Sequence, residues 1–120
     1  MVKVVIFGSR TFQNEFQASL TIEASIHRFI PHGSIVLHGD ASGADRIAAA
    51  VCERNACDVI PFNADWNRYG KRAGIIRNIQ MLDEQPDWAL GFWNGESKGS
   101  LHMIRECAKR SIFQIVVGIP

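Results

Sequence analysis

Cysteine is scarce in this chain of 120 residues, and its three copies, Cys52, Cys57 and Cys107, form no CxxC pair. An odd number without that spacing predicts neither a disulfide framework nor a zinc site, and free thiols are typical of a reducing cytoplasm. No apolar run is long enough to span a bilayer, and the opening MVKVVIFG is too short and strand-like for a signal peptide. We therefore expect a cytoplasmic protein that uses no metal, no cofactor and no membrane.

Net charge is also nearly absent, because 13 basic residues are balanced by 12 acidic ones. This balance provides no general attraction to nucleic acid or to a membrane surface. Any anion must therefore be bound locally, and nucleic acid is not the expected partner. The chain also lacks repeats, linkers and low-complexity segments. Its apolar fraction of 47% is ordinary for a globular protein, and its length suits one domain, residues 1–120.

Two kinds of apolar segment alternate along the chain. Short runs rich in β-branched residues predict strands at residues 1–7, 35–37, 58–62, 87–93 and 112–117. Helical spacing predicts helices after a cap at Asn14 and Gln17, and at residues 44–51, 73–84 and 100–110. This alternation with short loops predicts a single doubly wound, Rossmann-like α/β domain, with a five-stranded, mainly parallel sheet and helices on both faces.

Two details of these elements can be tested by the structure. Pro61 favours either the end of the strand at residues 58–62 or an edge position for it, because proline has no N–H for a sheet ladder. We expect Ile75, Ile79 and Leu82 on one face of the helix at residues 73–84, and Leu101, Ile104 and Ala108 on the inward face of the last helix.

The stretch from Ile35 to Val51 joins a strand to a helix through a turn that contains Gly39 and Gly43. Ser42 and Asp45 have the spacing of a capping box, in which each side chain accepts a hydrogen bond from a backbone N–H at the helix start. The remaining N–H groups and the helix dipole would then favour an anion at this turn. The glycines could equally serve the geometry of a tight turn alone.

Polar and aromatic residues collect after four of the five predicted strands. The turns at the opposite edge of the sheet lack such a collection. In a parallel sheet, ligands bind at the carboxyl ends of the strands, where the strand order reverses. Glycine, serine and arginine suit a phosphate, flat rings suit a base, and Asp40 suits ribose hydroxyls or a helix cap. Arg10 could instead be a solvated turn residue, and Trp93 partly a core residue. The predicted ligand residues are Gly8, Ser9, Arg10, His38, Gly39, Asp40, Ser42, Gly43, Asp45, Trp66, Tyr69, Lys71, Arg77, Asn78, Trp93, Asn94, Lys98, Gly99 and Ser100.

Four segments together resemble the YspA-like branch of the SLOG superfamily, which is related to the cytokinin-activating phosphoribohydrolases and to the Rossmann domain of the DNA-processing protein family. The segments are GSR from Gly8, HGDASGAD from His38, ADWNRYGKRAGIIRNIQML from Ala64 and GFWNGESKGSLHMI from Gly91. The resemblance implies a Rossmann-like pocket for nucleotide-derived molecules, used in sensing or processing them. The pocket residues that it implies are Gly8, Ser9, Arg10, Gly39, Ser42, Gly43, Asp45, Arg77, Asn78, Gly99 and Ser100.

The chain departs from the family pattern in two places. The family usually has a second glycine where this chain has Asp40, and a Gly-Gly-x-Gly-Thr loop where it has residues 94–100. The phosphoribohydrolases also carry a glutamate at the position of Met103, and methionine cannot act as an acid or a base. Catalysis would therefore depend on Asp40 or Glu96, the two candidate catalytic residues.

The leading hypothesis is a protein that binds a small nucleotide-derived ligand, such as a nucleotide, ADP-ribose or a cyclic nucleotide, as a sensor, carrier or sequestering protein. The second is a nucleotide N-glycosidase, phosphoribohydrolase or phosphohydrolase. The third is a single-stranded nucleic-acid binder that uses the basic residues Arg68, Lys71, Arg72 and Arg77 with stacking aromatic rings. The resemblance also implies a homodimer or a higher homo-oligomer.

Overall fold

Five strands form one sheet in the computed structural model, which describes residues 1–120. They are β1 (Lys3–Gly8), β2 (Ile35–His38), β3 (Asp58–Pro61), β4 (Trp88–Trp93) and β5 (Gln114–Gly118). All neighbouring strands pair in parallel, in the order β3-β2-β1-β4-β5. The predicted α/β class with a five-stranded parallel sheet is thus confirmed.

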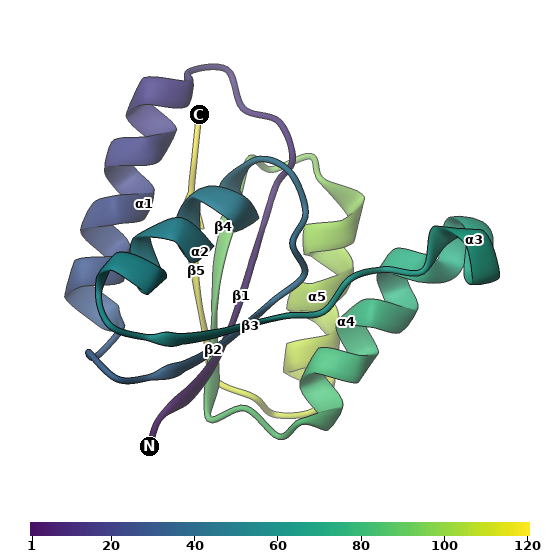
Figure 1. The fold of residues 1–120 in the computed structure, drawn as a ribbon. Helices are drawn as coiled ribbons and strands as arrows, with labels where there is room; N and C mark the ends of the chain where they lie inside the picture. The colour runs from purple at the N-terminus through teal and green to yellow at the C-terminus, as the bar shows by residue number, and fades with distance from the viewer.

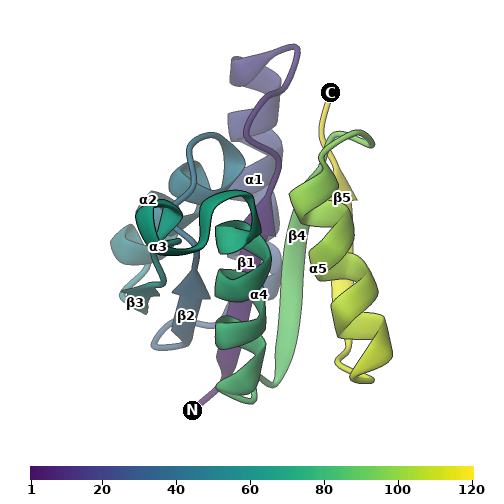
Figure 2. The ribbon, with the colours of Figure 1, turned by 90° about the vertical axis from the view of Figure 1, so that its right-hand side faces the viewer.

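Helices cover both faces of this sheet. They are α1 (Glu15–Phe29), α2 (Ala44–Arg54), the short α3 (Trp66–Tyr69) with the 3-10 turn η1 (Gly70–Arg72), α4 (Ala73–Asp83) and α5 (Lys98–Lys109). Ile22 of α1 and Ala48 of α2 share one buried cluster with Val4, whereas Met81 of α4 and Met103 of α5 belong to the other. Figure 1 and Figure 2 show the result, with α1 and α2 on one face and α4 and α5 on the opposite face. The doubly wound arrangement is therefore confirmed.

β1 is the strand at which the order of the sheet reverses. The chain first adds β2 and β3 on one side of β1, and then crosses to the other side for β4 and β5. The loop after β1 leads to α1 on one face, and the loop after β4 leads to α5 on the other. The two loops consequently diverge at the carboxyl edge, which is where folds of this kind bind ligands.

The burial of the strands follows their positions in the sheet. β1 and β4 each have four buried central residues, because helices cover both of their faces. β3 is an edge strand, as Pro61 predicted. β5 forms the opposite edge, and its sequence QIVVG carries no charge.

α5 turns a different face to the sheet from the one predicted. The Oγ of Ser97 caps the helix by accepting a hydrogen bond from the backbone N–H of Ser100 at 3.3 Å. The apolar residues of α5 fit two overlapping stripes, and the structure buries the one that includes Met103 and Cys107. The expected inward residues Leu101 and Ile104 are only partly buried, and Ala108 is exposed.

The predicted apolar face of α4 is directed to the core over only part of its length. Leu82 is buried and Ile79 partly buried, as expected, but Ile75 is 44% exposed. The first turn of α4 lies beyond the carboxyl edge of the sheet, so that Ile75 borders the cavity described below and not the core. None of the helices combines the length and the apolar character that a membrane crossing needs.

The three thiols differ in their expected reactivity. Burial raises the pKa of Cys52 from 9.0 to about 12, and that of Cys107 to about 11, because a thiolate is poorly solvated in apolar surroundings. At pH 8 we expect iodoacetamide to modify only the partly exposed Cys57 in the folded protein, and all three cysteines after denaturation. Mass spectrometry gives the number of modified cysteines. Modification of Cys107 in the folded protein would contradict this prediction.

The same two raised pKa values predict how stability depends on alkaline pH. The unfolded chain releases these protons near pH 9, whereas the folded chain keeps them up to about pH 11 and 12. The contribution of the two buried thiols to the free energy of unfolding is therefore complete below pH 9, and it is lost as the pH rises from 9 to about 12.

Candidate functional site

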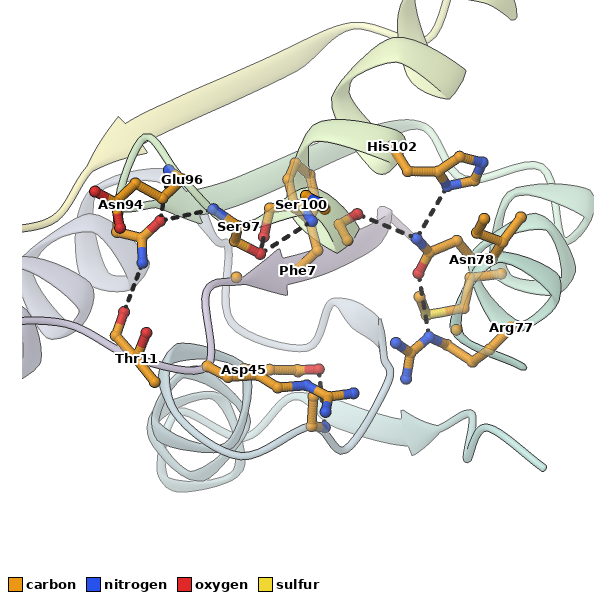
Figure 3. Close-up of a pocket in the computed structure, with 18 of the residues that line it drawn as sticks. Phe7, Thr11, Asp45, Arg77, Asn78, Asn94, Glu96, Ser97, Ser100 and His102 are labelled. Atoms are coloured by element: carbon orange, nitrogen blue, oxygen red, sulfur yellow. Dashed lines mark hydrogen bonds between the residues drawn. The ribbon is translucent and has the colours of Figure 1, made fainter. Parts of the chain in front are cut away.

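A cavity of about 540 Å³ opens at the carboxyl edge of the sheet, between the loops that follow β1 and β4 (Figure 3). Twenty residues line it, and they come from segments at or after the ends of β1, β2, β3 and β4. The predicted ligand residues among them are Gly8, Arg10, Asp45, Trp66, Lys71, Arg77, Asn78, Asn94, Lys98, Gly99 and Ser100. The fold thus brings together side chains that lie far apart in the sequence.

The other predicted ligand residues lie outside the lining of this cavity. They are Ser9, His38, Gly39, Asp40, Ser42, Gly43, Tyr69 and Trp93. Most of them shape the loops that carry the lining residues.

Ser9 links the end of β1 to the loop after β4. Its side chain is completely buried, and its Oγ accepts a hydrogen bond from the backbone N–H of Asn94 at 3.0 Å. Its own N–H donates to the carbonyl of Phe92, and its carbonyl accepts from the N–H of Ala44 at the start of α2. Ser9 therefore holds three elements in place around the cavity.

Asn94 organises the loop that leads into α5 (Figure 3). Its Oδ1 accepts hydrogen bonds from the N–H groups of Glu96 and Ser97, at 2.8 and 2.9 Å, and its Nδ2 donates to the carbonyl of Thr11 at 2.9 Å. The half-buried Trp93 donates its indole N–H to the carbonyl of Ser97 at 3.1 Å. These bonds fix the loop that places the first turn of α5 beside the cavity.

The capping box predicted for α2 is wrong. The cap residue is Gly43, with a φ of 87°, and no side chain caps the helix. Ser42 lies one residue before the cap and is exposed, because the left-handed backbone at Gly43 replaces the extended conformation of a capping serine. The Asp45 carboxylate instead reaches back into the loop, where its Oδ2 accepts from the N–H groups of Gly39 and Ala41 at 3.1 and 3.2 Å.

The second carboxylate oxygen of Asp45 lies beside His38. Asp45 is 3% exposed, and its Oδ1 has no hydrogen-bond partner. This oxygen is 3.4 Å from Nδ1 of His38, a distance at which a protonated imidazole would form an ion pair. Nδ1 accepts a hydrogen bond from the N–H of Asp40 at 3.1 Å, however, and this requires its lone pair. The neutral imidazole therefore carries its proton on Nε2, and His38 supports the loop between β2 and α2.

Asp40 adopts a left-handed conformation with a φ of 51°, which glycine adopts easily and aspartate tolerates. This conformation gives a physical reason for the glycine that the family pattern has at this position. The Asp40 carboxylate pairs with Nε of Arg46 at 3.3 Å, and both side chains are substantially exposed. Asp40 is thus engaged in a surface ion pair outside the cavity lining.

Arg77 and Asn78 of α4 connect the loop after β2 to the start of α5. Arg77 donates from Nη1 to the carbonyl of Gly39 at 2.7 Å and from Nε to Oδ1 of Asn78 at 3.1 Å. Because this Oδ1 is an acceptor, Nδ2 of Asn78 is the donor to the carbonyl of Gly99 at 3.4 Å and to Nδ1 of His102 at 3.2 Å (Figure 3). A side chain at Gly39 would collide with the Arg77 guanidinium, so glycine leaves room for it.

Positive side chains outnumber negative ones around the cavity. The charged lining residues are the cations Arg10, Lys71, Arg77 and Lys98 and the acids Asp45 and Glu96. Burial lowers the pKa of Arg77 from its ordinary value, and the Asp45 carboxylate opposes this shift whereas the Arg10 cation adds to it. An anion that enters would stabilise a half-buried cation in this position. The local electrostatics therefore favour an anionic ligand, although the whole chain is nearly neutral.

Some lining residues were not predicted from the sequence. They are Phe7, Thr11, Ala41, Gly74, Ile75, Met81, Ser97 and His102. Phe7 and Met81 also belong to the core, and nothing in an apolar run marks which side chains border a cavity. His102 could have been found, because it lies four residues after Lys98 and thus shares a helix face with it. The structure contains no group of three or more acidic, histidine or cysteine side chains that could hold a metal ion.

Comparison with known proteins gives a family and a fold. Residues 2–69 match the model of the YspA, cpYpsA-related SLOG family. The chain is similar to the Gene 61 protein of Mycobacterium phage D29, with 38% identity over 123 residues that cover 98% of each chain.

Two solved structures of DNA processing protein A share the fold. The protein from Helicobacter pylori, described for its single-stranded DNA binding mode, superposes with a TM-score of 0.69 at 17% identity. The protein from Streptococcus pneumoniae superposes with a TM-score of 0.55 at 12% identity. The matches cover 96% and 97% of this chain, but this chain spans only 64% and 59% of those proteins.

Proposed function

Since the chain belongs to the YspA, cpYpsA-related SLOG family, we propose that its cavity binds a small nucleotide-derived ligand. The observation that carries this proposal is the convergence of cationic, hydroxyl, amide and aromatic side chains from four strand ends on one cavity. Core packing has no need for such side chains at this edge. The volume of about 540 Å³ lies within the usual range of small-molecule sites.

The phosphate end of the ligand is expected between the loop after β1 and the start of α5. Gly99 and Ser100 lie in the first turn of α5, where the helix dipole favours negative charge. Lys98 adds a cation there, and Arg10 approaches from the loop after β1. Arg77, already anchored to two acceptors, supplies a cation whose position is fixed before the ligand enters.

Isothermal titration calorimetry with a panel of ligands tests this proposal. The panel contains ADP-ribose, AMP, cyclic AMP and ribose 5-phosphate, with adenosine as the unphosphorylated control. We expect phosphorylated ligands to bind at least about ten-fold more tightly than adenosine, because a hydrogen bond to a charged group contributes about 1.5–3 kcal/mol. Their affinity should fall as the salt concentration rises. A folded protein that gives no heat of binding with any of these ligands would contradict the proposal.

Hydrolysis of the bound ligand is a second candidate function, favoured by the position of Glu96. Of the two candidate catalytic residues, Glu96 lines the cavity and Asp40 does not. Met103 is fully buried in the core, so the position of the phosphoribohydrolase glutamate supplies no acid or base here. Chromatography of AMP and ADP-ribose incubated with the protein decides the matter. Product that the wild type forms and the variant Glu96→Gln does not form supports hydrolysis. Unchanged substrate with the wild type excludes hydrolysis of these two ligands.

Single-stranded DNA is a third candidate ligand, for which the surface of α3 and η1 is the relevant feature. Arg68, Lys71 and Arg72 are exposed there, next to Trp66, which is 48% exposed. Cations beside an aromatic ring are typical of sites that bind single strands without sequence preference, and the Helicobacter pylori protein of the same fold binds single-stranded DNA. Fluorescence anisotropy of an oligothymidine tests this, and binding that does not weaken with salt would contradict it.

The homo-oligomer and the cytoplasmic location remain predictions. Exposed apolar side chains on the surface of α1 and at β5 are compatible with self-association; they include Phe16, Leu20, Phe113 and Val116. Sedimentation velocity over a range of concentrations measures the oligomeric state directly.

A further inference from the structure

Three aromatic residues near the carboxyl edge could hold a nucleobase. Their burial and their contacts show which of them can touch a ligand in the cavity. Trp93 is half-buried, and its indole N–H is bonded to the carbonyl of Ser97 at 3.1 Å. Tyr69 lies outside the cavity lining, with the guanidinium of Arg68 over its ring at 5.2 Å. Trp66 lines the cavity and is 48% exposed. Trp66 is therefore the one of the three whose ring borders the ligand space.

A glycine and an arginine lie close to the Trp66 ring. Its Cη2 atom lies 3.6 Å from the point where a Cβ atom on Gly74 would be, and Nη2 of Arg77 lies 3.9 Å from the same point. The Cζ atom of Arg10 lies over the ring, 5.4 Å from its centroid. The ring thus carries a guanidinium from the loop after β1 and lies near Gly74 in the first turn of α4.

The segment that carries Trp66 places no side chain in the core. α3 and η1 contain no buried residue, and Figure 1 shows α3 projecting beyond the end of α4. α3 is capped locally, where Oδ1 of Asp65 accepts from the N–H of Arg68 at 3.1 Å. The core therefore does not depend on this ring.

We propose that Trp66 is the nucleobase platform of the cavity, and that the base replaces the Arg10 guanidinium on its ring. This inference rests on the proposed function and narrows the ligand class to phosphorylated molecules that carry a flat base. A cation over an exposed ring is held weakly, whereas a base stacked on an aromatic side chain is held more strongly, so the exchange is favourable. Arg10, once displaced, becomes available to the phosphate oxygens, which it can contact with two N–H groups.

The experiment compares ADP-ribose, which carries an adenine base, with ribose 5-phosphate, which is phosphorylated but has no base, on the wild type, Trp66→Leu and Trp66→Phe. Leucine keeps an apolar side chain but removes the ring, and phenylalanine keeps a smaller ring. We expect Trp66→Leu to weaken ADP-ribose about ten-fold, and to change ribose 5-phosphate by less than about two-fold. Trp66→Phe should retain most of the affinity for ADP-ribose. Because Trp66 contributes nothing to the core, the melting temperatures should stay equal.

Tryptophan fluorescence provides an independent measurement. ADP-ribose should change the emission of the wild type, and this change should be lost in Trp66→Phe although Trp88 and Trp93 remain. Wild-type binding of ADP-ribose that is equally tight in Trp66→Leu would overturn this inference and leave the proposed function standing. A wild type that binds none of the phosphorylated ligands of the calorimetry panel would overturn both.

Discussion

Gly43→Ala is expected to lower the free energy of unfolding by about 4 kcal/mol, because a sparsely populated backbone conformation and an overpacked contact each contribute about 1–3 kcal/mol. Gly43 has a φ of 87° and a ψ of −135°, which suit glycine alone. A Cβ atom there would also collide with the backbone of Arg10, whose carbonyl carbon and Cα would both lie 2.7 Å away. Neither backbone segment can yield easily, because the carbonyl of Ser9 is bonded to the N–H of Ala44.

Gly33→Ala is the matched control for this substitution. Gly33 has a similar φ of 80°, but no atom lies within 4 Å of the position of its Cβ. Alanine there should cost only the strain of a left-handed conformation, about 1 kcal/mol. Urea denaturation of both variants measures the difference. Equal losses at the two positions would show that the contact between the loop after β1 and the start of α2 is not tight.

Arg77→Met is expected to weaken the binding of ADP-ribose by about 10- to 100-fold, or about 1.4–2.8 kcal/mol. The variant removes a cation that lines the cavity. It also removes the donors to the carbonyl of Gly39 and to Oδ1 of Asn78, so that the Asn78 amide keeps only the hydrogen bonds of its Nδ2. Arg77→Lys should show an intermediate loss, because lysine keeps the charge but cannot donate in two fixed directions.

The control for Arg77 is Arg46→Met. Arg46 carries the same charge on α2, but its side chain is 61% exposed and pairs with Asp40 outside the cavity. Its removal should change the affinity by less than about two-fold, since exposed ion pairs contribute at most about 1 kcal/mol and here contact no ligand. Calorimetry gives the affinities, and thermal unfolding shows whether each variant remains folded. An unchanged affinity in a folded Arg77→Met would place the ligand elsewhere.

The fold class could be predicted from the sequence because the apolar runs of its central strands are nearly continuous. Nearly continuous apolar runs mark β1 and β4 as buried on both faces, and Pro61 marks β3 as an edge. The strand order could not be read in the same way. It depends on which side of β1 the chain crosses to after β3, and no local pattern encodes that choice.

The candidate site was predictable to the extent that it follows from topology. Arg10 and Arg77 were placed together because the carboxyl ends of parallel strands share one edge of the sheet. The roles of the two serines, Ser9 and Ser42, were not predictable. A hydroxyl within a glycine-rich turn can point to the ligand, the interior or the solvent, and the backbone angles at Gly43 decide this in a way that residue type does not.

The hydrogen bonds of Ser9 to three elements make most of the cavity rim a preassembled structure. The α3–η1 segment, without a buried side chain, forms the adjustable part. We expect the entropy lost on ligand binding to come mainly from residues 66–72, because no buried side chain restrains their backbone. Substitutions within this one short segment could tune affinity and residence time over a wide range while the sheet and its stability stay the same.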